Sequence, residues 1–431
     1  MNELYPDSLE ITPLSGPCDV IASVPGSKSI TNRALVLAAL SARDHDCVLL
    51  GALHSEDTEV MVNCLNRLGF HVEPGWPTVE VKRTPGPRVI PAKSADLFVG
   101  NSGTTVRFLT AVVSLGEGAY RLDGVPRMRE RPIQDLLDAL RQLGVEAVSE
   151  MNNGCPPVRI TSSGRWNESM VQVRGNVSSQ FLSGLMLAAP FADGPTTLRV
   201  DRGLVSQPYV GMTQRMLTEW GLLNKSHFVG DFTFGGRQTS DLGSYTIEPD
   251  ASAASYFFAV PAIVGGLVKV TGLGKDSMQG DIRFVEVLRQ MGCHVEYGED
   301  GITVGRGTLH GIDVDMNDIS DTVMTLGAVA CFAEGPTSIR NVAHIRHKET
   351  DRLAALATEI RRIGASVEEF DDGLTIRPAP LHGAEIETYN DHRIAMSLAL
   401  VGLRIPGIVI RNPACVAKTY PGFFADLEKL R

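Results

Sequence analysis

Residues 25–33 combine a glycine-containing turn with side chains that can bind an anion. They read Pro-Gly-Ser-Lys-Ser-Ile-Thr-Asn-Arg, so that Lys28, Ser29 and Arg33 lie within one short stretch. An apolar segment, residues 34–40, follows directly, and a helix that is apolar on every side must be buried. A helix start presents free N–H groups that favour an anion. A capped core helix with a solvated lysine fits the same residues, and a Walker A loop does not, because Ser27 precedes Lys28.

Further segments place hydroxyl, amide or cationic groups at expected helix starts or in loops. Gly103 permits close approach of the backbone to a ligand. Arg131 precedes Pro132, which we expect to be the first residue of a helix. Two hydroxyls beside free N–H groups suit a phosphate, although each such cap can also be purely structural. The candidates of this hydroxyl and amide kind are Ser178, Ser179, Gln180 and Ser206.

The densest run of charge is residues 346–352, Arg-His-Lys-Glu-Thr-Asp-Arg. Lys348 and Arg352 are four residues apart, which would place both cations on one face of a helix. A network of ion pairs at a helix entry is the structural alternative. Arg393 and Lys418 each add a cation near another expected element start. No Gly-x-Ser-x-Gly elbow exists to support a hydrolase triad.

Two interleaved repeats describe the elements that must position these residues. Glycines that follow amphipathic helix ends stand at 69, 144, 221, 292 and 364, with spacings of 75, 77, 71 and 72 residues. Glycine just past a helix end is the expected terminator. Polar residues that open nearly apolar helices recur at similar spacing and look like N-caps. These residues are Asn32, Asn101, Ser178, Asp250, Asp321 and Asp391.

Six units of about 70 residues therefore fill the chain, each with the order strand–helix–strand–helix–strand–strand. Domain-size limits favour two lobes of three units each. Residues 241–245 are the best candidate for the crossing between the lobes. The strand that ends near Ile21 could pair with the second lobe.

The composition of the chain argues against several classes of function. The chain has 431 residues, a net charge of −10 and 43% hydrophobic residues. An acidic chain is a poor nucleic-acid binder, and no run of 18 apolar residues predicts a membrane span. The first residues resemble neither a signal peptide nor a transit peptide. Seven cysteines without a Cys-x-x-Cys pair indicate free thiols and no zinc site. We expect a cytoplasmic protein that acts on small molecules.

Seven motifs in order resemble the EPSP synthases, the 3-phosphoshikimate 1-carboxyvinyltransferases of the enolpyruvyl transferase family. They are Pro-Gly-Ser-Lys-Ser, Gly-Asn-Ser-Gly-Thr, Arg-Pro, Ser-Ser-Gln-Phe, Lys-Glu-Thr-Asp-Arg, Asn-Asp-His-Arg and Ala-Lys-Thr, between about residues 24 and 424. The resemblance implies an α/β fold of two similar lobes, each an inside-out α/β barrel of three βαβαββ repeats. One lobe would span 23–245 and the other 1–22 with 246–431, with the active site in the cleft between them.

The resemblance also implies the reaction and its residues. The enolpyruvyl group of phosphoenolpyruvate would pass to the 5-hydroxyl of shikimate 3-phosphate by addition and elimination, on the shikimate route to chorismate and the aromatic amino acids. Asp321 would be the base toward the hydroxyl, with Lys28 and Glu349 as proton-transfer groups. The phosphoenolpyruvate contacts would be Lys28, Gly103, Arg131, Gln180, Arg352, Arg393 and Lys418. The shikimate 3-phosphate contacts would be Lys28, Ser29, Arg33, Ser178, Ser179, Gln180, Ser206, Asp321 and Lys348.

No metal or organic cofactor is expected, the protein should act as a monomer, and glyphosate should inhibit it. His344 stands where some members have Asn, and His347 where Val is common, which puts one substrate contact near His344 in doubt. Three alternatives remain: a UDP-N-acetylglucosamine enolpyruvyl transferase, an RNA-terminus-binding module of the cyclase type, and a non-catalytic phosphometabolite sensor. The first would lack Lys-Glu-Thr-Asp-Arg and would carry a cysteine near residues 127–129, where this chain has none.

Overall fold

The computed structural model describes residues 5–43, 45–175, 177–200, 203–223 and 231–431. The chain divides into two compact units. We call residues 26–247 the central unit, and residues 1–25 with 248–431 the terminal unit. Each unit mixes helices with sheets, which confirms the predicted α/β class with two lobes.

The central unit has three sheets in its described residues, with the orders β13-β3-β5-β4, β6-β7-β9-β8 and β10-β11-β12. Its strands are β3 (Cys47–Leu50), β4 (His71–Gly75), β5 (Thr78–Lys82), β6 (Ser94–Phe98), β7 (Glu117–Asp123), β8 (Glu146–Ser149), β9 (Val158–Ser163), β10 (Met170–Val173), β11 (Thr196–Val200), β12 (Asp231–Phe234) and β13 (Ser244–Thr246). Its helices are α1 (Lys28–Ser41), α2 (Glu56–Arg67), α3 (Gly103–Val112), α4 (Gln134–Gln142), α5 (Ser179–Ala188) and α6 (Gln207–Glu219), with the 3-10 turns η1 (Val113–Leu115), η2 (Pro126–Glu130) and η3 (Ala189–Phe191).

The terminal unit repeats this plan with the sheets β15-β16-β14-β2, β17-β18-β20-β19 and β1-β22-β21. Its strands are β1 (Ser8–Glu10), β2 (Cys18–Ala22), β14 (Gly266–Thr271), β15 (His294–Tyr297), β16 (Gly301–Gly305), β17 (Asp313–Asp315), β18 (Thr337–Arg340), β19 (Ser366–Phe370), β20 (Gly373–Arg377), β21 (Glu385–Ile386) and β22 (Val409–Arg411). Its helices are α7 (Ala251–Val264), α8 (Phe284–Gln290), α9 (Val323–Ala330), α10 (Arg352–Arg362), α11 (His392–Gly402) and α12 (Phe423–Glu428), with the 3-10 turns η4 (Gly280–Arg283), η5 (Asn317–Thr322), η6 (Ala343–His347) and η7 (Pro413–Lys418).

Each sheet contains one parallel pair, and two of these pairs are formed by exchanged strands. β6 pairs with β7 across α3, and β17 pairs with β18 across α9. The strand before α1 is β2, yet β2 pairs in parallel with β14 of the terminal unit. The strand before α7 is β13, and it pairs in parallel with β3 of the central unit. The two links between the units therefore follow β2 and β13.

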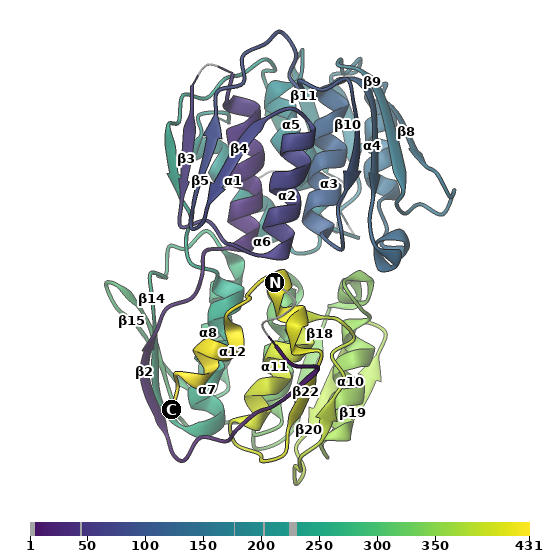
Figure 1. Ribbon diagram of the computed structural model, residues 1–431. Coiled ribbons are helices and arrows are strands. Elements are labelled where there is room, and N and C mark those ends of the chain that lie inside the picture. The colour runs from purple at the N-terminus through teal and green to yellow at the C-terminus, as the bar shows by residue number, and fades with distance from the viewer. Residues whose placement is uncertain (1–4, 44, 176, 201–202, 224–230) are drawn as a thin grey trace. The chain divides into compact units, whose positions relative to one another are not determined.

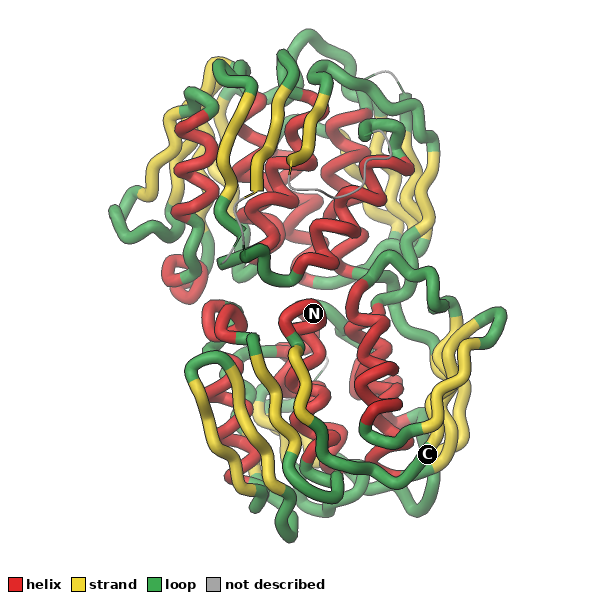
Figure 2. Tube along the Cα trace, turned by 180° about the vertical axis from the view of Figure 1, so that it is seen from behind, coloured by secondary structure: helices red, strands yellow, loops and turns green. Residues whose placement is uncertain are grey.

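Nearly apolar helices fill the interior of each unit. In the central unit α3 packs against α5 and α1, and in the terminal unit α11 packs against α9 and α7. Figure 1 shows α1, α3 and α5 side by side with strands outside them, and the same helices-inside arrangement is visible from behind in Figure 2. Residues 30–41 of α1 and 392–402 of α11 are all buried. Burial on every side explains why these segments carry no polar face.

The predicted helix terminators are confirmed. Gly69, Gly144, Gly221, Gly292 and Gly364 each follow a helix end with φ between 72° and 111°. This left-handed region is accessible to glycine at little cost. The local residue type was therefore sufficient to place these five helix ends.

Only half of the predicted helix starts are confirmed. Ser178, Asp250 and Asp391 are N-caps whose side chains accept a backbone N–H of the first turn. The predictions for the other three were wrong: Ser27 caps α1 instead of Asn32, Ser102 caps α3 instead of Asn101, and Asp321 lies in η5 before α9. The prediction that Pro132 begins a helix was also wrong, because α4 begins at Gln134.

Among the described residues, no helix is both long enough and apolar enough to cross a bilayer.

Candidate active site

The start of α1 carries the first predicted anion-binding group. The hydroxyl of Ser27 accepts the N–H of Ile30, which caps the helix and leaves Lys28 as its first residue. Nζ of Lys28 lies 3.6 Å from Oδ2 of Asp57, and both side chains are largely buried. Asp57 is the second residue of α2, two residues after the capping residue Ser55. Sequence reasoning missed Asp57, because its pairing with Lys28 spans 29 residues and only the acidic start of α2 marks it.

Arg33 is fully buried in the central unit and tied to α5 and α6. Its Nε donates to Oγ1 of Thr213 at 2.7 Å, and its Nη2 donates to Oγ of Ser183 at 3.3 Å. Its Nη1 donates to the carbonyl of Ser29 at 2.9 Å. Burial lowers the pKa of Arg33 to about 10, so the group stays charged at neutral pH. Arg33 thus fixes the backbone of Ser29, the neighbouring candidate.

Gly103 opens α3 beside two arginines. A Cβ atom at Gly103 would overlap the guanidinium of Arg131 and lie 3.0 Å from Nη1 of Arg107. Nη1 of Arg131 donates to the carbonyl of Asn101 at 2.8 Å, so a shift of Arg131 would break this hydrogen bond. Both arginines are at most 4% exposed. The structure therefore brings Gly103 and Arg131 together, as one binding group requires.

Arg107 links this group to the start of α5. Its Nη1 donates to Oε1 of Gln180 at 2.8 Å, and its Nη2 donates to the carbonyl of Pro132 at 3.1 Å. The amide nitrogen of Gln180 donates in turn to Oγ1 of Thr104 at 3.3 Å. The sequence analysis assigned no role to Arg107. Its position in the first turns of α3, beside an expected N-cap, was the available signal.

The hydroxyl candidates also occupy helix starts. Ser178 caps α5 and accepts the N–H of Gln180 at 3.3 Å, and Ser179 is the first residue of that helix. Ser206 precedes α6 with φ of 50°, a left-handed conformation that is uncommon for a residue with a side chain. Such strain persists where the surroundings fix the backbone, and it clusters at functional sites. These groups and the Lys28 group lie on the starts of α1, α3, α5 and α6 within one unit.

In the terminal unit Arg352 is the centre of a buried ion-pair network. Its three nitrogens contact three different carboxylates: Nε lies 2.8 Å from Asp391, Nη2 2.8 Å from Glu349 and Nη1 3.1 Å from Asp321. Burial lowers the pKa of Arg352, but Asp391, Glu349 and Asp321 together raise it further, so the net shift is upward. Arg352 is therefore a permanent cation that fixes the directions of three acids.

Asp321 also contacts two other cations. Nη2 of Arg393 lies 2.7 Å from its Oδ2, and Nζ of Lys348 lies 4.0 Å from its Oδ1. Lys418 approaches the second acid of the network, with Nζ 3.9 Å from Oε1 of Glu349. The predicted placement of Lys348 and Arg352 on one helix face was wrong, because α10 begins at Arg352 and Lys348 precedes it. Their side chains nevertheless meet at Asp321.

Two further buried groups surround this cluster. Nε2 of His344 lies 2.9 Å from Oγ of Ser320, and burial, with Lys348 nearby, lowers the pKa of His344 to about 3. His344 is therefore neutral at physiological pH. Burial and the charge of Asp321 raise the pKa of Asp281 to about 6, and Ser252 donates a hydrogen bond to its carboxylate. The sequence analysis predicted neither group as a site residue.

Among the described residues, no group of three or more His, Cys, Asp or Glu side chains could hold a metal ion. The chemistry that this arrangement supports is recognition of anions by fixed cations, with carboxylates beside them that can exchange protons. The cluster of the terminal unit holds four cations, Lys348, Arg352, Arg393 and Lys418, against three carboxylates.

Comparison with known proteins decides between the families that this chemistry allows. A sequence model described as EPSP synthase (3-phosphoshikimate 1-carboxyvinyltransferase) matches residues 12–427. The chain belongs to the EPSP synthase family. It is 49% identical to the 3-phosphoshikimate 1-carboxyvinyltransferase of Trichormus variabilis, over 98% of this chain and 99% of the relative. It is 44% identical to the enzyme of that name from Cronobacter sakazakii, with the same coverage.

Solved structures agree with this assignment. An EPSP synthase from Acinetobacter baumannii superposes with a TM-score of 0.78 at 25% identity, over 98% of each chain. The enolpyruvyl transferase NikO from Streptomyces tendae has the same TM-score at 20% identity, over 98% of this chain and 97% of that one, and this likeness shows the fold alone. The predicted family and its transferase activity are confirmed.

Proposed function

We propose that the chain transfers the enolpyruvyl group of phosphoenolpyruvate to the 5-hydroxyl of shikimate 3-phosphate. We also propose that the residues at the helix starts of the central unit and the ion-pair network of the terminal unit act on the same pair of substrates. Two observations support the proposal. Family membership specifies the reaction class. The residue roles rest chiefly on the geometry of Asp321, whose two carboxylate oxygens are bound by two different arginines. Arg352 donates to Oδ1 and Arg393 donates to Oδ2.

The proposed binding roles follow the resemblance. Phosphoenolpyruvate, which carries a phosphate and a carboxylate, would contact Lys28, Gly103, Arg131, Gln180, Arg352, Arg393 and Lys418. Shikimate 3-phosphate would contact Lys28, Ser29, Ser178, Ser179, Gln180, Ser206, Asp321 and Lys348, with Arg33 acting mainly through the Ser29 carbonyl that it holds. Guanidinium groups favour both anions because their planar N–H donors match carboxylate and phosphate oxygens.

The first proposed step is addition. The 5-hydroxyl oxygen forms a bond to C2 of phosphoenolpyruvate while Asp321 takes the hydroxyl proton. The π electrons of the C2–C3 bond take a proton at C3, which becomes a methyl group, and a tetrahedral ketal phosphate results. Glu349 is the group proposed to donate this proton: it enters the step as a carboxylic acid and leaves it as a carboxylate, and Arg352 and Lys418 hold its two oxygens in fixed directions. Positive charge that develops at C2 is stabilised by the preorganised acids.

The second proposed step is elimination. C3 loses a proton to Glu349, the double bond re-forms, and the bond from C2 to the phosphate oxygen breaks. Lys28 can donate a proton to the departing phosphate, and Asp57 beside it fixes the direction of its ammonium group. The net change converts the two substrates into 5-enolpyruvylshikimate 3-phosphate and inorganic phosphate.

We expect substrate binding to change the surroundings of Asp321, the proposed base. In the terminal unit, Asp321 lies among three cations, which hold its two carboxylate oxygens in ion pairs. Anionic groups of the substrates would bind these same cations and neutralise much of their field. Binding of the substrates would therefore release Asp321 from part of its pairing with these cations and make its carboxylate available to the attacking hydroxyl.

The test is release of inorganic phosphate from phosphoenolpyruvate in the presence of shikimate 3-phosphate. Each substrate alone, and UDP-N-acetylglucosamine as an alternative acceptor, serve as controls. We expect phosphate release only with shikimate 3-phosphate, in equal amounts with the enolpyruvyl product. Release with UDP-N-acetylglucosamine instead, or binding of shikimate 3-phosphate without turnover, would contradict the proposed substrate. Glyphosate should inhibit the reaction by competing with phosphoenolpyruvate.

A further inference from the structure

A cavity of about 410 Å³ lies entirely within the central unit. It is lined by the last residues of three buried elements, Ser41 of α1, Leu115 of η1 and Phe191 of η3. The candidate active-site groups lie at the opposite ends of these helices. α1 alone has 14 residues, so Lys28 and Ser41 are separated by about 20 Å at 1.5 Å per residue. This cavity is therefore distinct from the candidate active site.

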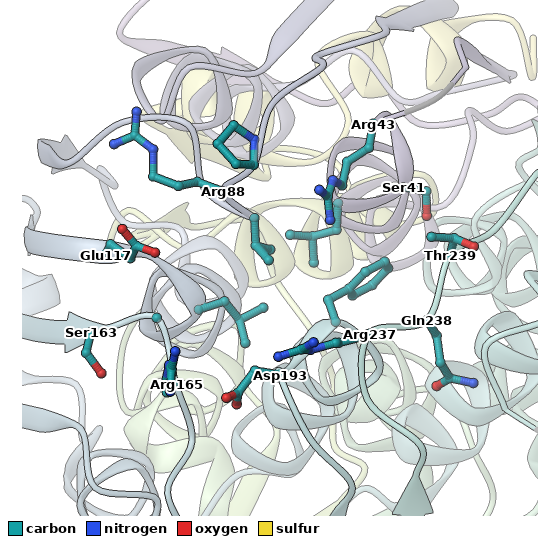
Figure 3. Close-up of a pocket in the computed structure, with 16 residues that line it drawn as sticks. Ser41, Arg43, Arg88, Glu117, Ser163, Arg165, Asp193, Arg237, Gln238 and Thr239 are labelled. Atoms are coloured by element: carbon teal, nitrogen blue, oxygen red, sulfur yellow. The ribbon is translucent and has the colours of Figure 1, made fainter.

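Four arginines, Arg43, Arg88, Arg165 and Arg237, line the cavity together with two acids, Glu117 and Asp193. In the part of the chain that the structure describes, none of these arginines forms an ion pair with either acid. Arg43 donates to the carbonyl of Gly86 at 3.0 Å. Figure 3 shows Arg43 and Arg237 directed toward the middle of the cavity, with Asp193 beside Arg237 and Arg88 farther out. Among the described lining residues, four arginines therefore stand against two acids.

The arginines are not needed to cap the adjoining helix ends. The carbonyl of Ala39 in α1 accepts the N–H of Ala42, and that of Val113 accepts the N–H of Gly116. The carbonyls of Pro190 and Ala192 accept the N–H groups of Gln238 and Arg237, at 2.8 and 2.6 Å. Backbone donors thus satisfy carbonyls that would otherwise attract the cationic side chains. The guanidinium groups remain available for a ligand.

Two features distinguish the residues that line the cavity. Arg237 has φ of 49°, a left-handed conformation that costs energy for a residue with a side chain, and the two backbone bonds to the end of η3 hold it there. Three lining residues each have one buried polar atom, Oγ of Ser41, Nη1 of Arg88 and Oε1 of Gln238, that has no hydrogen-bond partner among the described residues. Ser41 is only 5% exposed.

We propose that this cavity binds a small organic anion, a phosphate monoester or a carboxylate with an apolar body. Its anionic head would lie between the guanidinium groups of Arg43, Arg165 and Arg237. Its apolar body would contact the hydrophobic part of the lining, which includes Leu40, Val89, Leu115 and Phe191. The combination of concave apolar surface with few convergent polar groups is typical of small-molecule sites.

Trp166 supplies a local reporter for the test. Its N–H donates to Oδ1 of Asp193 at 3.2 Å, and its indole N–H donates to Oγ of Ser114 in η1. The chain has only two other tryptophans, Trp76 and Trp220. We would titrate phenyl phosphate, inorganic phosphate and phenol into the full chain and follow the fluorescence. Trp166→Phe identifies the part of the signal that comes from this cavity.

We expect phenyl phosphate to give a saturable, Trp166-dependent change with Kd of about 1 mM or tighter. The double variant Arg165→Gln/Arg237→Asn should weaken binding at least about tenfold, and Asn tolerates the left-handed backbone at position 237. Asp193→Asn should tighten binding about three- to tenfold by removing a repulsive charge. Arg83→Gln, an exposed arginine outside the cavity, and Lys28→Gln, in the candidate active site, should leave the Trp166-dependent signal unchanged.

The proposal would be overturned by the absence of a saturable Trp166-dependent change, or by equal affinity in the double variant. Equal affinity for phenol would show that no anion is recognised, and equal affinity for inorganic phosphate would show that the apolar lining contributes nothing. A response lost in Lys28→Gln would assign the binding to the candidate active site instead. Asp193→Asn is expected to bind phenyl phosphate more tightly than wild type does. This variant therefore tests the proposal even if the double variant is unstable.

Discussion

Nη1 of Arg352 lies 3.1 Å from Oδ1 of Asp321, in a network where the same guanidinium also contacts Glu349 and Asp391. The base and one proton-exchanging acid of the proposed mechanism are thus oriented by one buried cation. This contact spans 31 residues and connects η5 with the first residue of α10. Because both carboxylates share one anchor, the loss of Arg352 would disturb both proton transfers at once.

Asp321→Asn should lower kcat by about 10²–10⁴-fold, the range for loss of a general base. The side chain is not the N-cap of α9, so the change removes the base without uncapping that helix. Shikimate 3-phosphate affinity should stay the same or rise, because Lys348, Arg352 and Arg393 lose a competing acid. Steady-state kinetics measures both, with the exposed Asp371→Asn as the matched control. Near-normal kcat would show that Asp321 is not the base.

Gly103→Ala should weaken glyphosate more than phosphoenolpyruvate. The added methyl would overlap the guanidinium of Arg131, which Asn101 holds in place. The displaced cation should disturb the longer inhibitor more than the substrate. The comparison is the ratio of the glyphosate Ki to the phosphoenolpyruvate KM. Gly211→Ala in α6 is the control, because nothing lies within 4 Å of the added methyl there. If both variants keep the wild-type ratio, Gly103 serves only the turn.

Asp57→Asn should lower kcat by about 10–100-fold with little loss of stability. The carboxylate lies 3.6 Å from Nζ of Lys28, and an amide would keep the shape while removing the opposing charge. A purely structural pair would instead lower Tm and leave kcat unchanged. Asp46→Asn, which removes one of the two exposed acids beside Lys82, is the matched control in the same unit.

His344→Asn should make the protein less sensitive to acid. The folded-state pKa of His344 is about 3, below its usual value near 6.5, so the unfolded chain gains a proton first as pH falls. Wild-type stability from this group is present above pH 6.5 and is lost between about pH 6.5 and 3. The free energy of unfolding of the variant, relative to that of wild type, should therefore be about 2 kcal/mol higher at pH 5 than at pH 8. Parallel pH–Tm curves for the two proteins would contradict this account.

The sequence predicted best what depends on neighbouring residues. A glycine after an amphipathic helix end is decided locally, and Gly69 and Gly364 both adopt positive φ there. Caps were harder, because Asn101 and Ser102 are adjacent and both can cap, and the structure selects Ser102. The family and its reaction came from motif order, which single residues could not provide.

Side-chain partners distant in sequence could not be predicted. The sequence analysis identified seven cations as ligand contacts but did not predict their acidic partners. In the structure Asp57 pairs with Lys28, and three acids of the terminal unit pair with Arg352. The role of Arg33 also depends on Thr213 and Ser183, which are 180 and 150 residues away. Such contacts arise only when the helices pack, and no local pattern encodes them.

The most direct test of the central claim is the reaction in D2O, followed by NMR at C3 of phosphoenolpyruvate and of the product. Addition followed by elimination passes through a methyl group at C3, so we expect deuterium in the vinyl position of the product and in recovered phosphoenolpyruvate. Asp321→Asn should slow both incorporation and product formation together. Product that forms at the normal rate with no deuterium at C3 would contradict the addition–elimination mechanism and the roles assigned to Asp321 and Glu349.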